Sequence, residues 1–560
     1  MFSSAKAFDE ERFKHLIALI IAVVTVISAG IAFLQSDASA RDDRANRDTK
    51  RYATEAMGRK VSGDARVNFD YNSAYQSWHE LDTLASSATS RGDAPAATRY
   101  MKLRDEMTSL SPLLAAPYFN AAQGQPNINR YEADVYLVEI TALNEKFSAA
   151  SGVKDAWDSK ANGYVFHLTL LAVSFFLFGL SITIANPFTR WIFSGMGMII
   201  TVVAIGMAVT TWVAPVPDLR DQGNAIDAYA RGVGLAHQER WDEALTAYSE
   251  AIQAVPSYTS AYVARAQIYV QQNNYQQAVA DYERARAEGS QSASVAGELA
   301  WAYHLQGRFD DATAMNRTAL SASPDELWIQ FDLGLSLLAA GQVDAAKAEY
   351  AKGMDFAAKQ VADAQEAKQE VPSFLWWSLD DAAQSIDSLL AAPGSGTGAP
   401  PRNKLADPTI ITPIGRALNQ QLKSLAVALE YTGKPPAGPV AAKVSPFQFS
   451  AAVKDNQGQP GDPVIADSFP NGTDEVLVNF DYEGLQDGQD VLFKVYIDGE
   501  EDPSWRLIAP WDLGAAGTAV KPLSLAYSDV FVLDPGQYTV ELYVNTQLVQ
   551  QGSFVVEEQG

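Results

Sequence analysis

The chain has 560 residues, of which 47% are hydrophobic and 19% charged, so we expect a folded protein with several domains rather than one core. Its formal net charge of −25 argues against a nucleic-acid partner, because binding to phosphates requires clustered Lys and Arg. The absence of cysteine excludes disulfides, thiolate metal sites and thiol nucleophiles.

The first apolar run lies close to the amino terminus. An N-terminal tail, residues 1–15, with the basic residues Lys6, Arg12 and Lys14, precedes an uncharged apolar stretch at 16–34. A helix of this length crosses about 30 Å of hydrocarbon. We interpret it as transmembrane helix 1, an uncleaved signal-anchor. Ala38-Ser39-Ala40 matches a signal-peptidase site, so cleavage within residues 1–40 stays open.

The segment 35–163 is predicted to be helical throughout. Its helix breakers gather in "SGD" at 62–64, "RGDAP" at 91–95 and "GQPN" at 124–127. We predict an extracytoplasmic helical bundle whose outer helices continue into the neighbouring apolar runs. In layout it resembles the periplasmic four-helix sensor bundles of bacterial receptors, and whether it binds a ligand stays open.

Two further apolar runs follow. They predict transmembrane helices at 164–186 and 191–214, joined by a turn short enough to form a hairpin. Lys6, Arg12 and Lys14 of the tail, together with Arg190 in the turn, predict that the tail and the turn face the cytoplasm of a bacterial cell. Everything after residue 214 is then extracytoplasmic.

Small residues recur every 34 positions beyond the third run. They are Ala244, Ala278, Ala312 and Ala346, each preceded twelve positions earlier by Gly232, Ala266, Ala300 or Gly334. A Tyr follows the Ala by four in every unit except the third, which has Asn316. This pattern resembles the tetratricopeptide repeat (TPR) family, in four repeats at 225–358. The resemblance implies an α-solenoid of helix pairs whose small residues permit close packing.

The same resemblance implies a binding function. Members of this family generally hold a peptide or a partner helix in a concave groove lined by the first helix of each repeat. The corresponding positions here are Tyr229, Val233, Val263, Gln267, Trp301, His304, Trp328 and Phe331. The Lys and Asn side chains with which some members bind a terminal carboxylate are absent from them. The alternative is that these aromatic residues pack on one another or on the end of the solenoid.

The remainder of the chain changes from a helical to a strand period. We predict capping helices at 359–392, a linker with one helix at 393–440, and an immunoglobulin-like β-sandwich at 441–560. The ending, 534–556, resembles the last hairpin of small bacterial surface-associated sandwich domains. The last 120 residues carry 19 acidic and 5 basic side chains, which favours a soluble surface.

No constellation of catalytic residues emerges. The five His have no metal-ligand spacing, and the acidic cluster at 498–505 lacks the spacing of a calcium loop. No phosphate-binding loop and no serine nucleophile elbow occurs. We therefore expect no catalytic residues, no metal and no cofactor.

These observations predict a multidomain membrane protein with three transmembrane helices, an all-α bundle, an α-solenoid and an all-β sandwich. Its predicted function is non-catalytic: a membrane-anchored scaffold that recruits a protein or peptide through the repeat groove. The other predicted partner is the lipid bilayer, and a homo-oligomer or a subunit of a membrane complex stays open. The alternative is a membrane sensor whose bundle binds a small ligand, with cytoplasmic repeats as its output.

Overall fold

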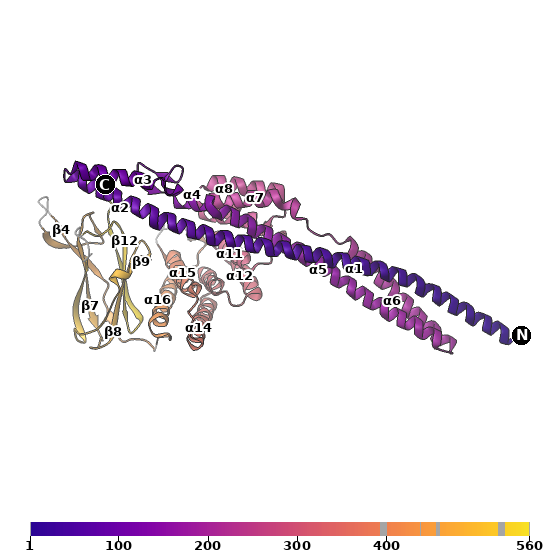
Figure 1. Cartoon of the computed structure of the whole chain (residues 1–560). Helices are drawn as coiled ribbons and strands as arrows, with labels where there is room; N and C mark the ends of the chain where they lie inside the picture. The colour runs from indigo at the N-terminus through magenta and orange to yellow at the C-terminus, as the bar shows by residue number, and fades with distance from the viewer. Residues whose placement is uncertain (1, 392–399, 437, 455–459, 525–531, 559–560) are drawn as a thin grey trace. The chain divides into compact units, whose positions relative to one another are not determined.

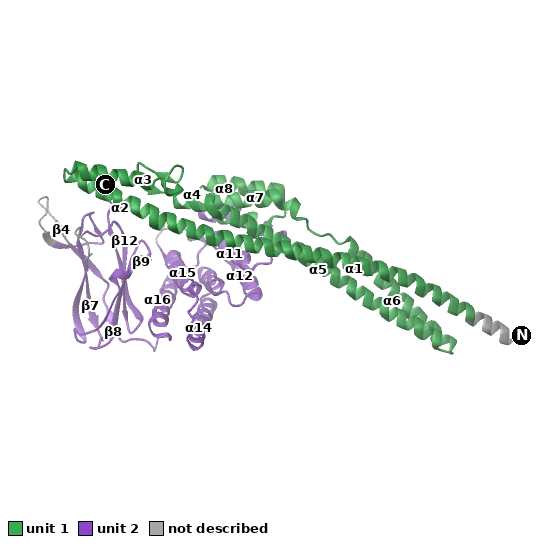
Figure 2. Cartoon of the chain, viewed as in Figure 1, with its two compact units in different colours: residues 1–268 green, residues 269–560 purple. Residues whose placement is uncertain are grey.

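The computed structural model describes residues 2–391, 400–436, 438–454, 460–524 and 532–558. It divides into two compact units, residues 1–268 (unit 1) and residues 269–560 (unit 2) (Figures 1 and 2). Residues 392–399, the Gly/Pro-rich start of the predicted linker, lie outside the described residues.

Unit 1 is built on three long apolar helices. They are α1 (Phe2–Phe69), α5 (Val138–Thr183) and α6 (Pro187–Val213). Helices α1 and α5 share an apolar core that includes Ile17 and Val24 of the first and Leu171 and Phe178 of the second. Helical segments at Glu11–Ser90, Ile128–Thr183 and Pro187–Val213 are long and apolar enough to cross a membrane, judged by length and composition only.

Basic side chains hydrogen-bond carbonyl groups at both ends of the α5–α6 hairpin. At the turn, the Arg190 guanidinium donates to the Ile184 carbonyl, which ends α5, at 3.0 Å. At the other end, the Lys160 ammonium donates to the Trp212 carbonyl in the last turn of α6 at 3.1 Å. Carbonyls at helix ends lack intrahelical partners, so these two contacts satisfy groups that the hairpin leaves open.

Between α1 and α5 the chain forms a small bundle. Its elements are η1 (Asp70–Tyr75), α2 (Gln76–Ser90), α3 (Ala94–Met107), η2 (Pro112–Leu114), β1 (Phe119–Asn120), β2 (Gln125–Pro126), α4 (Ile128–Glu132) and η3 (Ala133–Leu137). The expected break at 62–64 is wrong, because α1 continues through it. A Cβ on Gly63 would lie 2.5 Å from Tyr136, so this glycine permits close packing within the bundle.

The repeats form eight helices in sequence. They are α7 (Leu219–His237), α8 (Trp241–Ala254), α9 (Thr259–Gln271), α10 (Tyr275–Ala287), α11 (Ala293–Leu305), α12 (Phe309–Ala322), α13 (Leu327–Ala339) and α14 (Val343–Ala367). The four recurring alanines, from Ala244 to Ala346, are fully buried. A Cβ on Gly232 would lie 2.5 Å from the ring of Tyr248, and one on Gly334 2.8 Å from the ring of Tyr350. Glycine at these positions therefore allows the paired helices to approach.

Two more helices complete the helical part of unit 2. They are α15 (Ser373–Leu390) and α16 (Pro408–Thr432), with the short η4 (Arg402–Lys404) between them. Helix α16, which the sequence places in a linker, adds Leu422 to the same apolar core as Leu337 of α13 and Leu379 of α15. The Asn419 amide donates to the Ala383 carbonyl of α15 at 2.8 Å. Helix α16 is therefore packed into the end of the solenoid.

The C-terminal part is a β domain of two sheets. Its elements are β3 (Lys443–Val444), β4 (Gln448–Lys454), β5 (Pro460–Ile465), β6 (Ser468–Phe469), β7 (Glu475–Glu483), β8 (Asp490–Ile497), β9 (Glu500–Glu501), η5 (Pro503–Trp505), β10 (Leu507–Pro510), β11 (Ala516–Ser524), β12 (Gly536–Val544) and β13 (Gln547–Val556). One sheet has the order β10-β8-β12-β13-β6, with β9 beside β8, and the other β11-β7-β4-β5, with β3 beside β7. Phe449 and Phe554, from opposite sheets, lie 4.9 Å apart in one shared core.

Strand β13 joins the β domain to α16. The Ser424 hydroxyl of α16 accepts a hydrogen bond from the Leu548 backbone amide at 3.0 Å, and the Gln420 amide donates to the Leu548 carbonyl at 2.5 Å. Val427 of α16 is buried in a cluster with Leu492 and Tyr543 of the sheet. The end of the solenoid and the β domain thus share an interface inside unit 2.

Candidate functional site

The first repeat lies against α4 and α5. His237 of α7 hydrogen-bonds Glu132 at 2.8 Å, and the Tyr258 hydroxyl donates to Glu145 of α5 at 2.6 Å. A hydrogen bond to a charged group contributes about 1.5–3 kcal/mol. These contacts therefore hold the first repeat to α4 and to α5, the helix that contains the second apolar run.

The predicted groove residues of the first repeat take part in this interface. Tyr229 and Val233 are half-buried and pack in an apolar cluster that also contains Ala142 of α5. Burial raises the pKa of Tyr229 to about 12, and the Glu145 carboxylate adds to the shift. Both side chains are thus partly covered by the chain itself.

In the second repeat, the predicted positions lie on α9. Val263 is half-buried and Gln267 is exposed.

Three of the four predicted residues of the third and fourth repeats meet between α11 and α13, whereas Phe331 stacks on Tyr350 of α14. The ring of Trp301 stacks on His304 at 5.2 Å, and His304 hydrogen-bonds Ser336 of α13 at 3.1 Å. One turn before Trp301, a Cβ on Gly297 would lie 2.5 Å from the ring of Trp328. The two Trp side chains therefore lie along one seam between the first helices of consecutive repeats.

Exposure separates the four predicted residues of these two repeats. His304 is 1% exposed and Phe331 2%, whereas Trp301 and Trp328 are partly exposed. Burial lowers the pKa of His304 to about 3, so its imidazole is neutral at physiological pH. His304 and Phe331 contribute to packing in this structure, and the surface that a partner can reach belongs to the two Trp.

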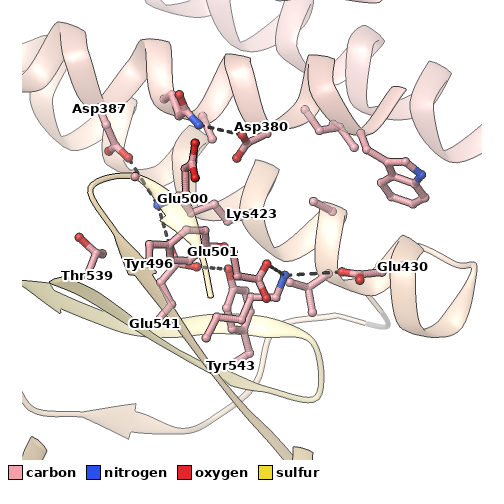
Figure 3. A pocket seen from close by; sticks show the side chains of 18 of the residues that line it. Asp380, Asp387, Lys423, Glu430, Tyr496, Glu500, Glu501, Thr539, Glu541 and Tyr543 are labelled. Carbon is pink, nitrogen blue, oxygen red and sulfur yellow. Dashed lines mark hydrogen bonds and ion pairs between the residues drawn. The ribbon is translucent and has the colours of Figure 1, made fainter. Parts of the chain in front are cut away.

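A second polar feature of unit 2, the junction pocket, lies between the helical end and the β domain. Its cavity of about 630 Å³ is lined by α15, α16, β8, β9 and β12 (Figure 3). Acidic side chains come from all of these elements except β8: Asp380, Asp387, Glu430, Glu500, Glu501 and Glu541. Three basic side chains, Lys423, Lys494 and Arg506, complete the charged lining.

Every basic side chain of the junction pocket is held in ion pairs. Lys423 lies 2.7 Å from Glu541 and 3.4 Å from Asp387 (Figure 3). The other two basic side chains share the same two acids: Lys494 lies 3.0 Å from Glu501 and 3.5 Å from Glu430, and Arg506 lies 2.6 Å from Glu501 and 2.9 Å from Glu430.

The sequence analysis did not identify this pocket. The residues that line it extend from Trp376 to Tyr543, and no short motif connects them. The available signals were the acidic pair Asp380-Asp381 in an otherwise amphipathic segment and the acidic cluster at 498–505. Both are also typical of a solvated surface.

Comparison with known proteins supports the repeat. Residues 263–326 match the tetratricopeptide repeat family, so this chain contains a tetratricopeptide-repeat solenoid, followed by a β-rich C-terminal region. No curated protein matches the chain. Tetratricopeptide repeats generally mediate protein–protein interaction and present concave binding surfaces.

Solved structures similar to parts of the chain include three proteins. "YrrB: a TPR protein with an unusual peptide-binding site" is 18% identical over 29% of this chain and 86% of its own, with a TM-score of 0.23. MamA from AMB-1 is 20% identical over 27% of this chain and 88% of its own, with a TM-score of 0.23. The C-terminal part of a TPR repeat-containing protein from Cytophaga hutchinsonii is 14% identical over 50% of this chain and 96% of its own, with a TM-score of 0.26.

Proposed function

We propose that this chain is a non-catalytic, membrane-anchored scaffold that recruits a protein or peptide partner through its tetratricopeptide repeats. The observation that carries the proposal is the attachment of the first repeat to α4 through Glu132–His237 and to α5 through Glu145–Tyr258. Because α5 is one of the three apolar helices, a bilayer around those helices would place the first repeat at its surface. A partner bound there gains a high local concentration without any chemical step.

Within the repeats, we propose the seam of Trp301 and Trp328 as the contact surface. Tryptophan is enriched among residues that dominate binding energy at protein interfaces. The Trp328 indole donates to Glu326 at 3.1 Å, which fixes the ring while leaving it partly exposed. Further proposed contact residues, in the first two repeats, are Tyr229, Val233, Val263 and Gln267.

Photo-crosslinking tests this surface directly. A photoreactive amino acid is placed at Trp301 or Trp328 in the full-length protein in its own membranes. The matched control is the same amino acid at Thr318, an exposed position on the second helix of the third repeat. We expect one crosslinked partner from both seam positions and none from Thr318. Equal crosslinking from all three positions, or none from the seam, would contradict the proposal.

We propose that the repeats and the β domain are extracytoplasmic in a bacterial cell, with the amino terminus and the α5–α6 turn in the cytoplasm. The chain contains no cysteine, so single cysteines can be introduced without background. Exposed positions suited to labelling are Ser90 in the bundle, Ser321 in the repeats and Ala185 in the turn.

The labelling reagent is a membrane-impermeant maleimide applied to spheroplasts. We expect Ser90→Cys and Ser321→Cys to react in intact spheroplasts, and Ala185→Cys only after permeabilisation. The reverse pattern would overturn the proposed orientation and support a sensor with cytoplasmic repeats. Extraction of the protein by alkaline carbonate would instead contradict the membrane anchor.

A further inference from the structure

The charge balance of the junction pocket leaves two carboxylates without a cation. Six acids and three bases line it, and the ion pairs of the three bases reach four of the acids. Asp380 accepts a hydrogen bond from the Gln384 amide at 2.7 Å, and neither it nor Glu500 forms an ion pair with any residue that the structure describes. The pocket therefore carries an excess of negative charge.

The pocket contains charged side chains that are almost fully buried, and burying a charge is unfavourable. Glu541 is 1% exposed and the side chain of Lys494 is 7% exposed. Replacing such buried charges by apolar side chains of similar volume is often neutral or stabilising, so stability alone does not explain a charged lining. Burial raises the pKa of the Asp380 carboxyl even though Lys423 opposes the shift, which indicates that its charge is under-compensated.

Apolar surface accompanies these charges. The partly buried Trp376 and the aliphatic Leu379 line the pocket from α15. An indole face attracts ammonium and guanidinium groups, and a hydrocarbon chain gains by leaving water. The cavity of about 630 Å³ also has the size of a small-molecule site.

We propose that the junction pocket binds a small organic cation carrying primary ammonium or guanidinium groups, with Asp380 and Glu500 as its charge partners and Trp376 as its apolar wall. An anion is disfavoured, because it would have to displace carboxylates that already occupy all three basic side chains. This site is separate from the Trp301–Trp328 seam. Its occupant would contact both the helical end and the β domain.

Calorimetry on the full-length protein in detergent tests the proposal. The probes are 1,4-diaminobutane as a dication, butylamine as a monocation and 1,4-butanediol as a neutral molecule of the same shape. We expect the dication to bind most tightly, butylamine more weakly, and butanediol not at all. Binding of the dication should weaken at higher salt, because exposed charges are screened.

Substitutions locate the binding site. Asp380→Asn and Glu500→Gln each remove one charge while keeping the side-chain shape, and both positions are exposed, so folding should be preserved. Each should raise the dissociation constant of the diamine at least about tenfold, because each removes one hydrogen bond between charged groups. The matched control, Asp363→Asn at an exposed position on α14, should bind like the unmodified protein.

Three outcomes would overturn the proposal. The first is equal binding of butanediol and diaminobutane, and the second is unchanged diamine binding by Asp380→Asn and Glu500→Gln. The third is tight binding of inorganic phosphate or of Mg²⁺ that excludes the diamine, which would assign the pocket to another class of ligand. None of these outcomes depends on a repeat partner, so failure here leaves the scaffold function separately testable.

Discussion

The Lys423 ammonium lies 2.7 Å from the Glu541 carboxylate, which is only 1% exposed. Helix α16 and strand β12 therefore share a buried ion pair, and the Tyr543 hydroxyl also donates to Glu541 at 2.5 Å. Burying a charge is tolerated when it is paired and hydrogen-bonded. The pair is one of several contacts between the solenoid and the β domain, beside the Lys494–Glu430 and Arg506–Glu430 ion pairs.

Lys423→Met should destabilise this interface. It leaves the Glu541 carboxylate buried without its cation, a loss of about 3 kcal/mol. Hydrogen–deuterium exchange of the full-length protein should show reduced protection in α16 and β12. Lys359→Met, at an exposed position on α14, serves as the control and should change protection by less than about 0.5 kcal/mol. Identical protection in the two variants would contradict a structural role for the pair.

Substitution by alanine should have different effects on stability at two glycines of α7. A Cβ at Gly232 would lie 2.5 Å from the rigid ring of Tyr248, whereas one at Gly223 meets nothing within 4 Å. Gly232→Ala should cost about 1–3 kcal/mol through overpacking. Gly223→Ala should be neutral or stabilise by up to about 1 kcal/mol, because alanine favours helix. Exchange rates in α7 and α8 measure both, and similar effects of the two substitutions would refute the packing argument.

Asn316→Leu should stabilise the third repeat. Asn316 is fully buried, and neither of its side-chain polar atoms has a hydrogen-bond partner among the described residues. Leaving buried polar groups unpaired costs about 1–3 kcal/mol, which a leucine of similar volume recovers. We expect slower exchange in α12. Asn316→Ala separates the two contributions, since it removes the amide but leaves a cavity. Faster exchange in the leucine variant would mean that the amide has a partner.

Asp381 on α15 should make stability depend on pH. Burial, with a smaller contribution from Asp380, raises the pKa of its carboxyl from the ordinary 3.8 to about 6. Asp332 and Tyr350 belong to the same set of groups, because the Asp381 charge raises the pKa of both. The folded state therefore binds the proton more tightly than the unfolded state.

The stabilisation by this proton is complete below about pH 4 and is lost as the pH rises through about 6, a change of about 1–3 kcal/mol. Asp381→Asn should reduce this dependence, with a remainder from Asp332, whose pKa burial also raises, and it should raise stability at pH 7.5 relative to the unmodified protein. Thermal unfolding of both proteins at pH 4.5 and 7.5 measures the difference, with Asp355→Asn as an exposed control. An unchanged difference between the two pH values in Asp381→Asn would refute the assignment.

Several features could be predicted from local patterns in the sequence. The 34-residue spacing from Ala244 to Ala346 predicted the repeat, because every helix pair needs a small residue at the same crossing. The alternation of apolar and polar residues in β7, β8 and β12 likewise predicted strands, since alternate side chains of a strand lie on opposite faces. The apolar runs predicted long helices that could span a bilayer.

Other features depended on contacts between distant residues. Gly63 reads as a helix breaker, yet packing against Tyr136 determines its role inside a continuous helix. His304 and Trp301 look alike as groove candidates, but only packing against α13 decides which of them is buried. The junction pocket requires Asp380 of α15, Lys423 of α16 and Glu541 of β12, which lie far apart in the sequence. Periodicity along the chain therefore determined the elements and their order, whereas burial and the assembly of the charged pocket were decided by tertiary packing, because no local spacing encodes which faces meet.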